Sequence, residues 1–129
     1  MSDFRGKSPL WIALLVGIVF VLPAPAHARY GAVAVARTPW GYCTGGSNNF
    51  PSQAIADERA LYSCSTGGSG CTNCRIQTRF SGPGTCGYRT QGHGPGAHCL
   101  GVGRTAAEAY RLCVAKGCAC DPPLGGCNR

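Results

Sequence analysis

Short apolar runs separated by turns rich in glycine and proline make up most of the chain after residue 28, and they predict short strands. Residues 30–36 (YGAVAVA) and 41–44 (GYCT) flank a turn that contains Pro39. A further apolar run at 97–102 (AHCLGV) follows the loop at 91–96 (QGHGPG). Small and β-branched residues between turn formers favour strands, and the first two runs are spaced as a β-hairpin.

Residues 74–80 (CRIQTRF) alternate between apolar and polar positions. Successive side chains of a strand point to opposite faces, so Arg75 and Arg79 are predicted to share one face and Ile76 and Phe80 the other. We expect the apolar face to pack beneath the helices of the fold.

The loop at 81–85 (SGPGT) is expected to close a hairpin between this strand and residues 86–90 (CGYRT). With that pairing, Arg89 lies within about 5–8 Å of Arg75 and Arg79 on the same face. Neighbouring guanidinium groups repel one another unless an anion is present, and arginine suits bidentate contacts with carboxylate or phosphate. The alternative is a solvated face on which the arginine stems cover the sheet.

Two helices are predicted, each beginning at a hydroxyl residue. Ser52 precedes the stretch 53–64 (QAIADERALYSC), and Thr105 is followed three residues later by Glu108, as in a capping box. When Ser52 is aligned with Thr105, an offset of 53 residues, the apolar positions of both helices superimpose on one face. Asp57 lies within that face, where we expect a salt bridge or a position at the sheet edge.

Both halves of the chain have the same order of predicted elements, namely two short strands, a helix and a closing strand. We interpret this order as a diverged internal duplication with halves at about 30–80 and 86–129. The predicted fold class is α+β, a small antiparallel sheet with two helices from a diverged ββαβ-type repeat. Residues 29–129 have the length of a single small domain.

The first 28 residues have the pattern of a signal peptide. Arg5 and Lys7 precede the uncharged run 11–22 (WIALLVGIVFVL), and Ala26-His27-Ala28 fits the rule for cleavage after Ala28. Twelve apolar residues are fewer than the about 20 that a membrane-spanning helix needs, which disfavours an uncleaved anchor. We expect a secreted or periplasmic protein.

All ten cysteines lie in the expected mature chain, and an even number in an exported chain favours complete pairing into disulfides. Disulfides compensate for the small core of such a domain. Their connectivity does not follow from the sequence. The ten residues are Cys43, Cys64, Cys71, Cys74, Cys86, Cys99, Cys113, Cys118, Cys120 and Cys127.

Cys71 and Cys74 form a C-x-x-C motif, which occurs in zinc sites, in redox centres and in structural disulfides. A zinc site would need Cys118 and Cys120 as further ligands, and export normally oxidises such thiolates. A redox motif begins at a helix N-terminus, whereas residues 75–80 resemble a strand. We therefore expect structural disulfides, with no metal and no cofactor.

The chain is basic, with 12 lysines and arginines against five acidic residues and a formal net charge of +7. Such a balance favours acidic partners, here an anionic polymer, a lipid headgroup or an acidic protein surface. Nucleic acid is disfavoured because no basic surface interleaved with aromatic residues is evident. The candidate binding face consists of Arg75, Arg79 and Arg89.

No catalytic constellation is recognisable in the sequence. A nucleophile needs a neighbouring base and an orienting group, and after export only His93 and His98 remain as imidazoles. His93 is expected to be solvated in a loop, and His98 to be half-buried on a strand. We expect a protein that is not an enzyme; the alternative is a small secreted enzyme that uses a reduced cysteine or His98.

One set of motifs runs through nearly all of the expected mature chain. It consists of Tyr-Gly-Ala-Val-Ala, Trp-Gly-Tyr, a capped helix with A-x-x-x-A-L-x-x-C, and a cysteine-flanked strand leading to Cys-Gly. The set resembles the bacterial exported proteins grouped as domain of unknown function 4189. The resemblance implies export and a small α+β domain, with no established reaction and no catalytic residues. Its carriers are Tyr30, Gly31, Ala32, Val33, Ala34, Gly41, Tyr42, Ala56, Ala60, Leu61, Cys64, Cys74, Cys86, Gly87 and Ala109.

The chain departs from the family pattern in three places. Tyr88-Arg89 stands where small apolar residues usually follow Cys-Gly, and the second helix ends in Cys113 and Cys118 instead of A-L-x-x-C. The number of cysteines is also higher than the family pattern implies. Taken together, the sequence favours an exported, disulfide-stabilised binding protein. The alternative is a secreted effector or an inhibitor-like module whose target no visible motif encodes.

Overall fold

The structure, a computed structural model, describes residues 29–129, and the predicted signal peptide at 1–28 lies outside this part of the chain. The described residues form antiparallel sheets and two helices, which confirms the predicted α+β class. The helices are α2 (Gln53–Ser65) and α3 (Ala106–Val114). The strands are β1 (Tyr30–Thr38), β2 (Gly41–Phe50), β3 (Arg75–Ser81), β4 (Cys86–Gly94), β5 (Ala97–Gly103), β6 (Ala119–Cys120) and β7 (Leu124–Cys127).

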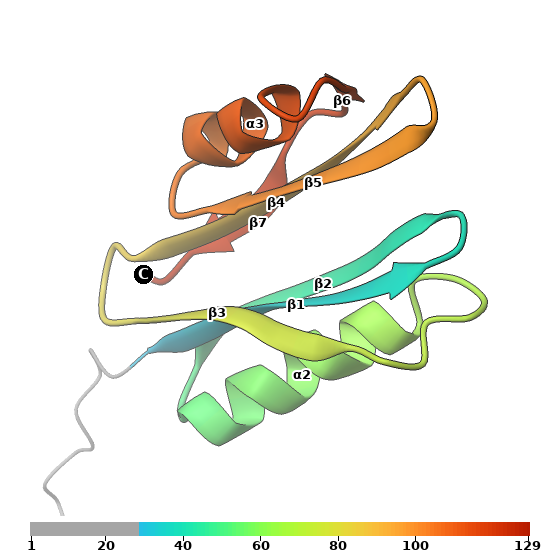
Figure 1. Cartoon of the computed structure of the whole chain (residues 1–129). Coiled ribbons are helices and arrows are strands. Elements are labelled where there is room, and N and C mark those ends of the chain that lie inside the picture. The colour runs from blue at the N-terminus through green and yellow to red at the C-terminus, as the bar shows by residue number, and fades with distance from the viewer. Residues whose placement is uncertain (1–28) are drawn as a thin grey trace, which may run out of the picture.

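The strands form two sheets where the sequence predicted one. Sheet A has the order β2-β1-β3, and sheet B has the order β5-β4-β6, with β7 also paired to β4. The sheets lie face to face, with α2 on the outer face of sheet A and α3 on the outer face of sheet B (Figure 1). The molecule is therefore a four-layer arrangement of helix, sheet, sheet and helix.

The predicted hairpin between β3 and β4 is wrong, because β3 pairs with β1 in sheet A and β4 pairs only within sheet B. Strand β1 is buried along nearly its whole length, so its backbone polar groups need a neighbouring strand on each edge, and β2 and β3 provide them. The loop between β3 and β4 crosses from one sheet to the other. Its Gly82 N–H donates to the carbonyl of Arg29 (2.8 Å), and its Gly84 N–H donates to the carbonyl of Asn128 (2.9 Å).

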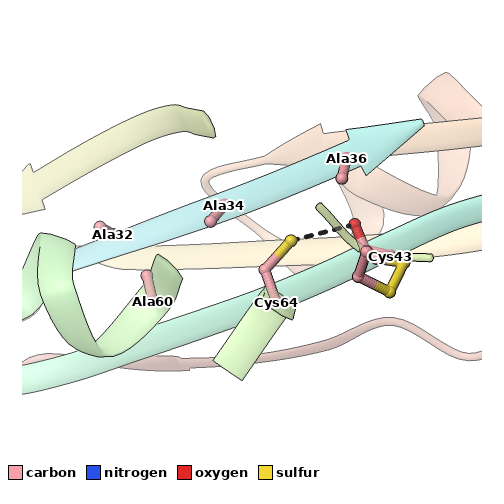
Figure 2. Packing of buried hydrophobic residues seen from close by; sticks show 7 residues of the cluster. Ala32, Ala34, Ala36, Cys43, Ala60 and Cys64 are labelled. Carbon is pink, nitrogen blue, oxygen red and sulfur yellow. Dashed lines mark hydrogen bonds between the residues drawn. A yellow bond between two sulfur atoms is a disulfide. The ribbon is translucent and has the colours of Figure 1, made fainter. Parts of the chain in front are cut away.

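Strand β1 contributes an apolar side chain to both of its faces. Its alanines face α2 and form a buried cluster with Ala60 and Cys64 of that helix (Figure 2). Because alanine is small, the helix axis can lie close to the sheet. On the opposite face, Val33 and Val35 pack against sheet B. That cluster contains Val33, Val35, Phe80, Leu100 and Val102.

Both predicted N-caps are confirmed. The Ser52 hydroxyl accepts a hydrogen bond from the Ile55 N–H (3.2 Å), and the Thr105 hydroxyl accepts one from the Glu108 N–H (3.0 Å). The Glu108 carboxylate accepts a hydrogen bond from the Arg104 N–H (2.8 Å), one residue before the position that a capping box uses. These bonds satisfy N–H groups that a helix start otherwise leaves without partners.

Each helix lies in close contact with a glycine of its sheet. A Cβ added at Gly45 of β2 would lie 2.5 Å from the carbonyl of Ala60 and 2.3 Å from the amide nitrogen of Cys64. One added at Gly101 of β5 would lie 2.0 Å from the carbonyl of Ala109. Each helix therefore rests on its strand with backbone against backbone, at a distance that only glycine permits.

The packing contacts change the predicted alignment of the two helices. The helix residue whose amide nitrogen lies against the glycine is Cys64 in α2 and Cys113 in α3. These two residues are 49 positions apart, whereas the predicted alignment used an offset of 53. The reason is length, because α2 has 13 residues and α3 has nine, so the N-caps align while the packed ends differ by one helical turn. The origin of the two halves by duplication stays a prediction.

All ten cysteines form disulfides, and four of the five bonds follow one pattern in both halves. In each half, one bond joins the second strand of the hairpin to the loop after the helix, and another joins the helix to the following strand or to the residue directly before it. The pairs are Cys43–Cys71 and Cys64–Cys74 in the first half, then Cys99–Cys118 and Cys113–Cys120 in the second. The fifth bond, Cys86–Cys127, joins β4 to β7.

The side chain of Asn128 links the C-terminus to β2, to the residue before β1 and to the β3–β4 loop, and it is only 2% exposed. Its Oδ1 accepts a hydrogen bond from the Asn49 N–H (2.8 Å), and its Nδ2 donates to the Thr85 hydroxyl (3.1 Å) and to the carbonyl of Arg29 (3.3 Å). A buried amide that makes this many bonds fixes the position of every segment it contacts.

Candidate functional site

The three arginines of the predicted binding face do not lie together. A β-bulge in β3 separates Arg75 from Arg79, because the register against β1 shifts between Val33 and Ala34 and leaves Gln77 as an extra residue. One extra residue moves every later side chain to the other face of the strand. Arg79 therefore lies on the side of α2, and Arg75 lies on the side that faces sheet B.

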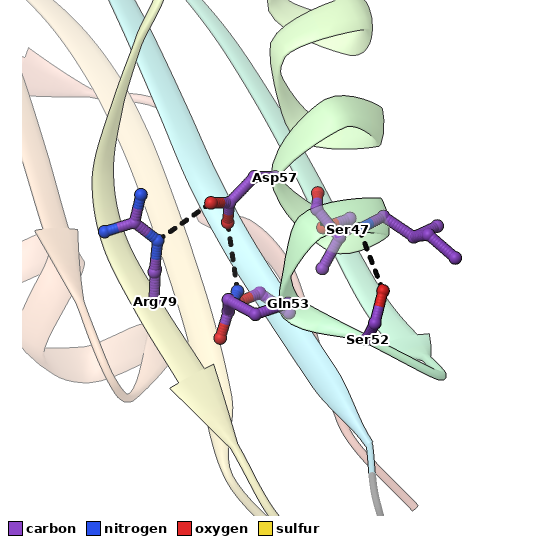
Figure 3. Close-up of polar contacts among 8 residues, drawn as sticks. Ser47, Ser52, Gln53, Asp57 and Arg79 are labelled. Atoms are coloured by element: carbon purple, nitrogen blue, oxygen red, sulfur yellow. Dashed lines mark hydrogen bonds and ion pairs between the residues drawn. The ribbon is translucent and has the colours of Figure 1, made fainter.

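Arg79 is part of an ion pair with α2. Its Nε donates to Oδ2 of Asp57 at 2.9 Å, and Nε2 of Gln53 donates to Oδ1 of the same carboxylate at 3.0 Å (Figure 3). The salt bridge predicted for Asp57 is thus confirmed. The Arg79 side chain is 55% exposed, so the pair contributes at most about 1 kcal/mol to stability.

Arg89 is a half-buried cation between the sheets. It lies on β4, and its Nε donates to the hydroxyl of Thr44 on β2 at 3.0 Å. Burial lowers the pKa of the Arg89 guanidinium, because desolvation disfavours its charged form. A small cavity of about 180 Å³, lined mainly by glycines and by the polar side chains of Ser47 and Asn48, adjoins it.

Arg75 lines an open groove of about 740 Å³ at one end of the space between the sheets, and we call it the inter-sheet groove. Val35 of sheet A and Leu100 of sheet B provide its apolar lining. The remaining lining residues are Arg37, Tyr42, Thr72, Asn73, Cys74, Arg75 and Gln77.

The inter-sheet groove carries positive charge and hydrogen-bond donors. Its lining includes two guanidinium groups, from Arg37 and Arg75, and no carboxylate. Within residues 29–129, the ion pair is the one between Asp57 and Arg79, so neither groove arginine is neutralised by a described acid. Arg37 lies 5.6 Å from the ring centre of Tyr42, and its Nη1 donates to the phenol oxygen at 3.5 Å.

Two disulfides hold one wall of the groove. Cys71 is bonded to Cys43 on β2, and Cys74 is bonded to Cys64 on α2, so the C-x-x-C segment is fixed at both ends. Thr72 and Asn73 lie between these bonds and are exposed. The two central residues of the motif therefore present a hydroxyl and an amide to the groove on a rigid backbone.

The disulfides also bear on the alternative interpretations of the C-x-x-C motif. Cys71 and Cys74 are bonded to different partners, whereas a redox centre joins its two cysteines to each other. Cys118 and Cys120, the further ligands of the zinc alternative, are bonded to Cys99 and Cys113. In the part of the chain that the structure describes, no group of three or more His, Cys, Asp or Glu residues is placed to hold a metal ion, and no helix there is long and apolar enough to cross a membrane.

His93 and His98 are cross-strand partners at the tip of the β4–β5 hairpin. Both are exposed, so the half-buried position predicted for His98 is wrong, and His93 lies in a strand where a loop was predicted.

Arg37 and Tyr42 were not among the residues of the predicted binding face. They are direct partners across the β1–β2 hairpin and so share a face. The turn at Pro39 was the signal that places them together. The turn does not reveal that Arg75 of β3 reaches the same groove, because the position of Arg75 depends on the bulge at Gln77.

The chain matches no family model, and no similar curated protein or solved structure was found. The resemblance to the domain of unknown function 4189 family stays a prediction.

Proposed function

We propose that this chain is an exported binding protein that holds a carboxylate-bearing polymer in the inter-sheet groove. Export through cleavage after Ala28 and membership of the domain of unknown function 4189 family are parts of the proposal. Five disulfides support an oxidising compartment, where such bonds persist. The observation that carries the binding function is the pair of guanidinium groups in a groove whose lining has no acid.

The lining of the groove suits an extended anionic ligand. The planar guanidinium groups of Arg37 and Arg75 match the two oxygens of a carboxylate. The Asn73 and Gln77 amides and the Tyr42 hydroxyl also line the groove, and they can form hydrogen bonds with neutral polar groups of the ligand. Because the groove is open to solvent, a segment of a polymer can enter it without a change in the fold.

Replacing both groove arginines, Arg37→Ala with Arg75→Ala, is expected to weaken binding of an oligogalacturonate by about 10- to 100-fold. Each hydrogen bond to a charged group contributes about 1.5–3 kcal/mol, and part of this remains available through water. The measurement is isothermal titration calorimetry at about 0.15 M salt, where long-range attraction is largely screened.

The matched control is Arg104→Ala with Arg111→Ala. Both arginines lie on the side of α3, and their replacement lowers the net charge by the same amount. This control is expected to bind within about twofold of the unmodified protein. Equal losses in both double variants would show that net charge alone attracts the polymer and would overturn the groove proposal. The protein could instead bind hexaglutamate or anionic lipid vesicles more tightly than oligogalacturonate, with this binding lost in the groove variant only. That result would support the groove as the binding site and would replace the proposed ligand.

A further inference from the structure

The ring nitrogens of His93 and His98 lie unusually close together. The two Nδ1 atoms are 3.1 Å apart, and the ring centres are 5.1 Å apart with the planes at 80°. In the metal-free protein, one Nδ1 can donate a hydrogen bond to the other. The same spacing is also the distance between two ligands of one metal ion.

The N–metal–N angle of such a site follows from the usual metal–nitrogen bond length and the distance between the two nitrogens. With both nitrogens at about 2.0–2.1 Å from the ion, a separation of 3.1 Å gives an N–metal–N angle of about 95–100°. This value lies between the about 90° of square-planar sites and the about 109° of tetrahedral sites. Each lone pair must then turn about 40° from the line that joins the nitrogens, and the χ2 torsion of an exposed histidine is soft.

The side-chain oxygen of Gln91 lies near His98, beside Gly41. Gly41, at the turn of the first hairpin, has φ of +146°, which favours glycine. A Cβ at this position would lie 3.6 Å from Nδ1 of His98 and 3.9 Å from Oε1 of Gln91. Gln91 precedes His93 by two residues on β4, so both side chains are on the same face of the strand.

We propose that His93 and His98 form a chelating site for a late first-row divalent cation, with Nδ1 of each ring as ligand and water in the remaining positions. Neutral imidazole is a strong ligand for Cu²⁺, Ni²⁺ and Zn²⁺, and Cu²⁺ binds most tightly in this series. No thiolate competes for the ion, because all ten cysteines are in disulfides. The site is separate from the inter-sheet groove and does not depend on its function.

The test is a titration with Cu²⁺, using full-length protein purified without a polyhistidine tag. His27 is replaced by alanine so that the proposed ligands are the two remaining imidazoles. We expect one ion bound per chain, with electron paramagnetic resonance showing two nitrogen ligands. His93→Ala and His98→Ala should each weaken binding on the order of 100-fold, because the second imidazole binds within the same molecule.

Independent surface histidines would behave differently. Each single variant would then retain about half of the bound Cu²⁺ at an unchanged dissociation constant, and that result would overturn the proposal. Unchanged binding in the variant that lacks both histidines would overturn it as well. Because both residues are exposed, the variants should keep the thermal unfolding temperature of the parent protein, which confirms that a lost site is not lost structure.

Discussion

Replacing Gly101 with alanine is expected to lower the free energy of unfolding by about 3 kcal/mol or more, and Gly45→Ala should have a similar effect. The new Cβ would lie 2.0 Å from the carbonyl of Ala109 in the first variant and 2.3 Å from the amide nitrogen of Cys64 in the second. Both obstacles are backbone atoms of a helix that a disulfide ties to the sheet, so neither can move away at low cost. Chemical denaturation followed by circular dichroism measures the change.

Gly68→Ala is the matched control for these two substitutions. A Cβ at Gly68 would meet nothing closer than the Cys71 sulfur at 3.8 Å, so we expect a change within about 0.5 kcal/mol. If Gly101→Ala prevents folding, the yield of oxidised native protein provides the comparison with Gly68→Ala. A stable Gly101→Ala variant, with a loss below about 1 kcal/mol, would contradict the close helix packing.

Removing the Cys86–Cys127 disulfide is expected to cost about 3–4 kcal/mol of stability. The bond closes the longest loop of the five, with a sequence separation of 41 between its cysteines. The entropy of an open loop of this length gives about 4 kcal/mol, and the Cys99–Cys118 and Cys113–Cys120 bonds inside it shorten the loop and lower the value. The double variant Cys86→Ala with Cys127→Ala tests this value by chemical denaturation.

The structural consequence of this change should be local. The disulfide at Cys127 holds strand β7 and the next residue, Asn128, in place. Asn128 in turn bonds to Asn49 and Thr85. Hydrogen exchange should therefore accelerate at β7 and at Asn49, and it should remain slow in α2. A cost below about 1 kcal/mol would show that the hydrogen bonds of Asn128 hold the C-terminus without the disulfide. Uniform acceleration throughout the chain would show that the disulfide stabilises the whole fold, which would contradict the local effect.

Local features of the fold were predictable from the sequence because they depend on neighbouring residues. The hydroxyl N-caps, the apolar strand at 30–36 and the first hairpin all follow from patterns within a few positions. Complete pairing of the cysteines followed from their even number and the expected compartment. The partners of each cysteine depend on the three-dimensional fold.

The errors concern long-range pairing. The glycines around Pro83 suit a hairpin loop equally well as a crossing between two sheets, and the choice is made by the need of β1 for a second neighbour. The alternation of β3 was also interrupted by the bulge at Gln77, which no residue type in CRIQTRF marks. For this reason Arg75, Arg79 and Arg89 have three different environments, and Arg75 alone of them reaches the inter-sheet groove.

The most direct test of the account is an NMR titration of ¹⁵N-labelled protein with oligogalacturonate. We predict chemical-shift changes at the side-chain Nε–H groups of Arg37 and Arg75 and at the amides of Tyr42 and Asn73, because these residues line the inter-sheet groove. The resonances of Arg104 and Arg111 should not move. Shifts concentrated on α3, with the groove resonances unchanged, would contradict the proposal that the ligand binds between the sheets.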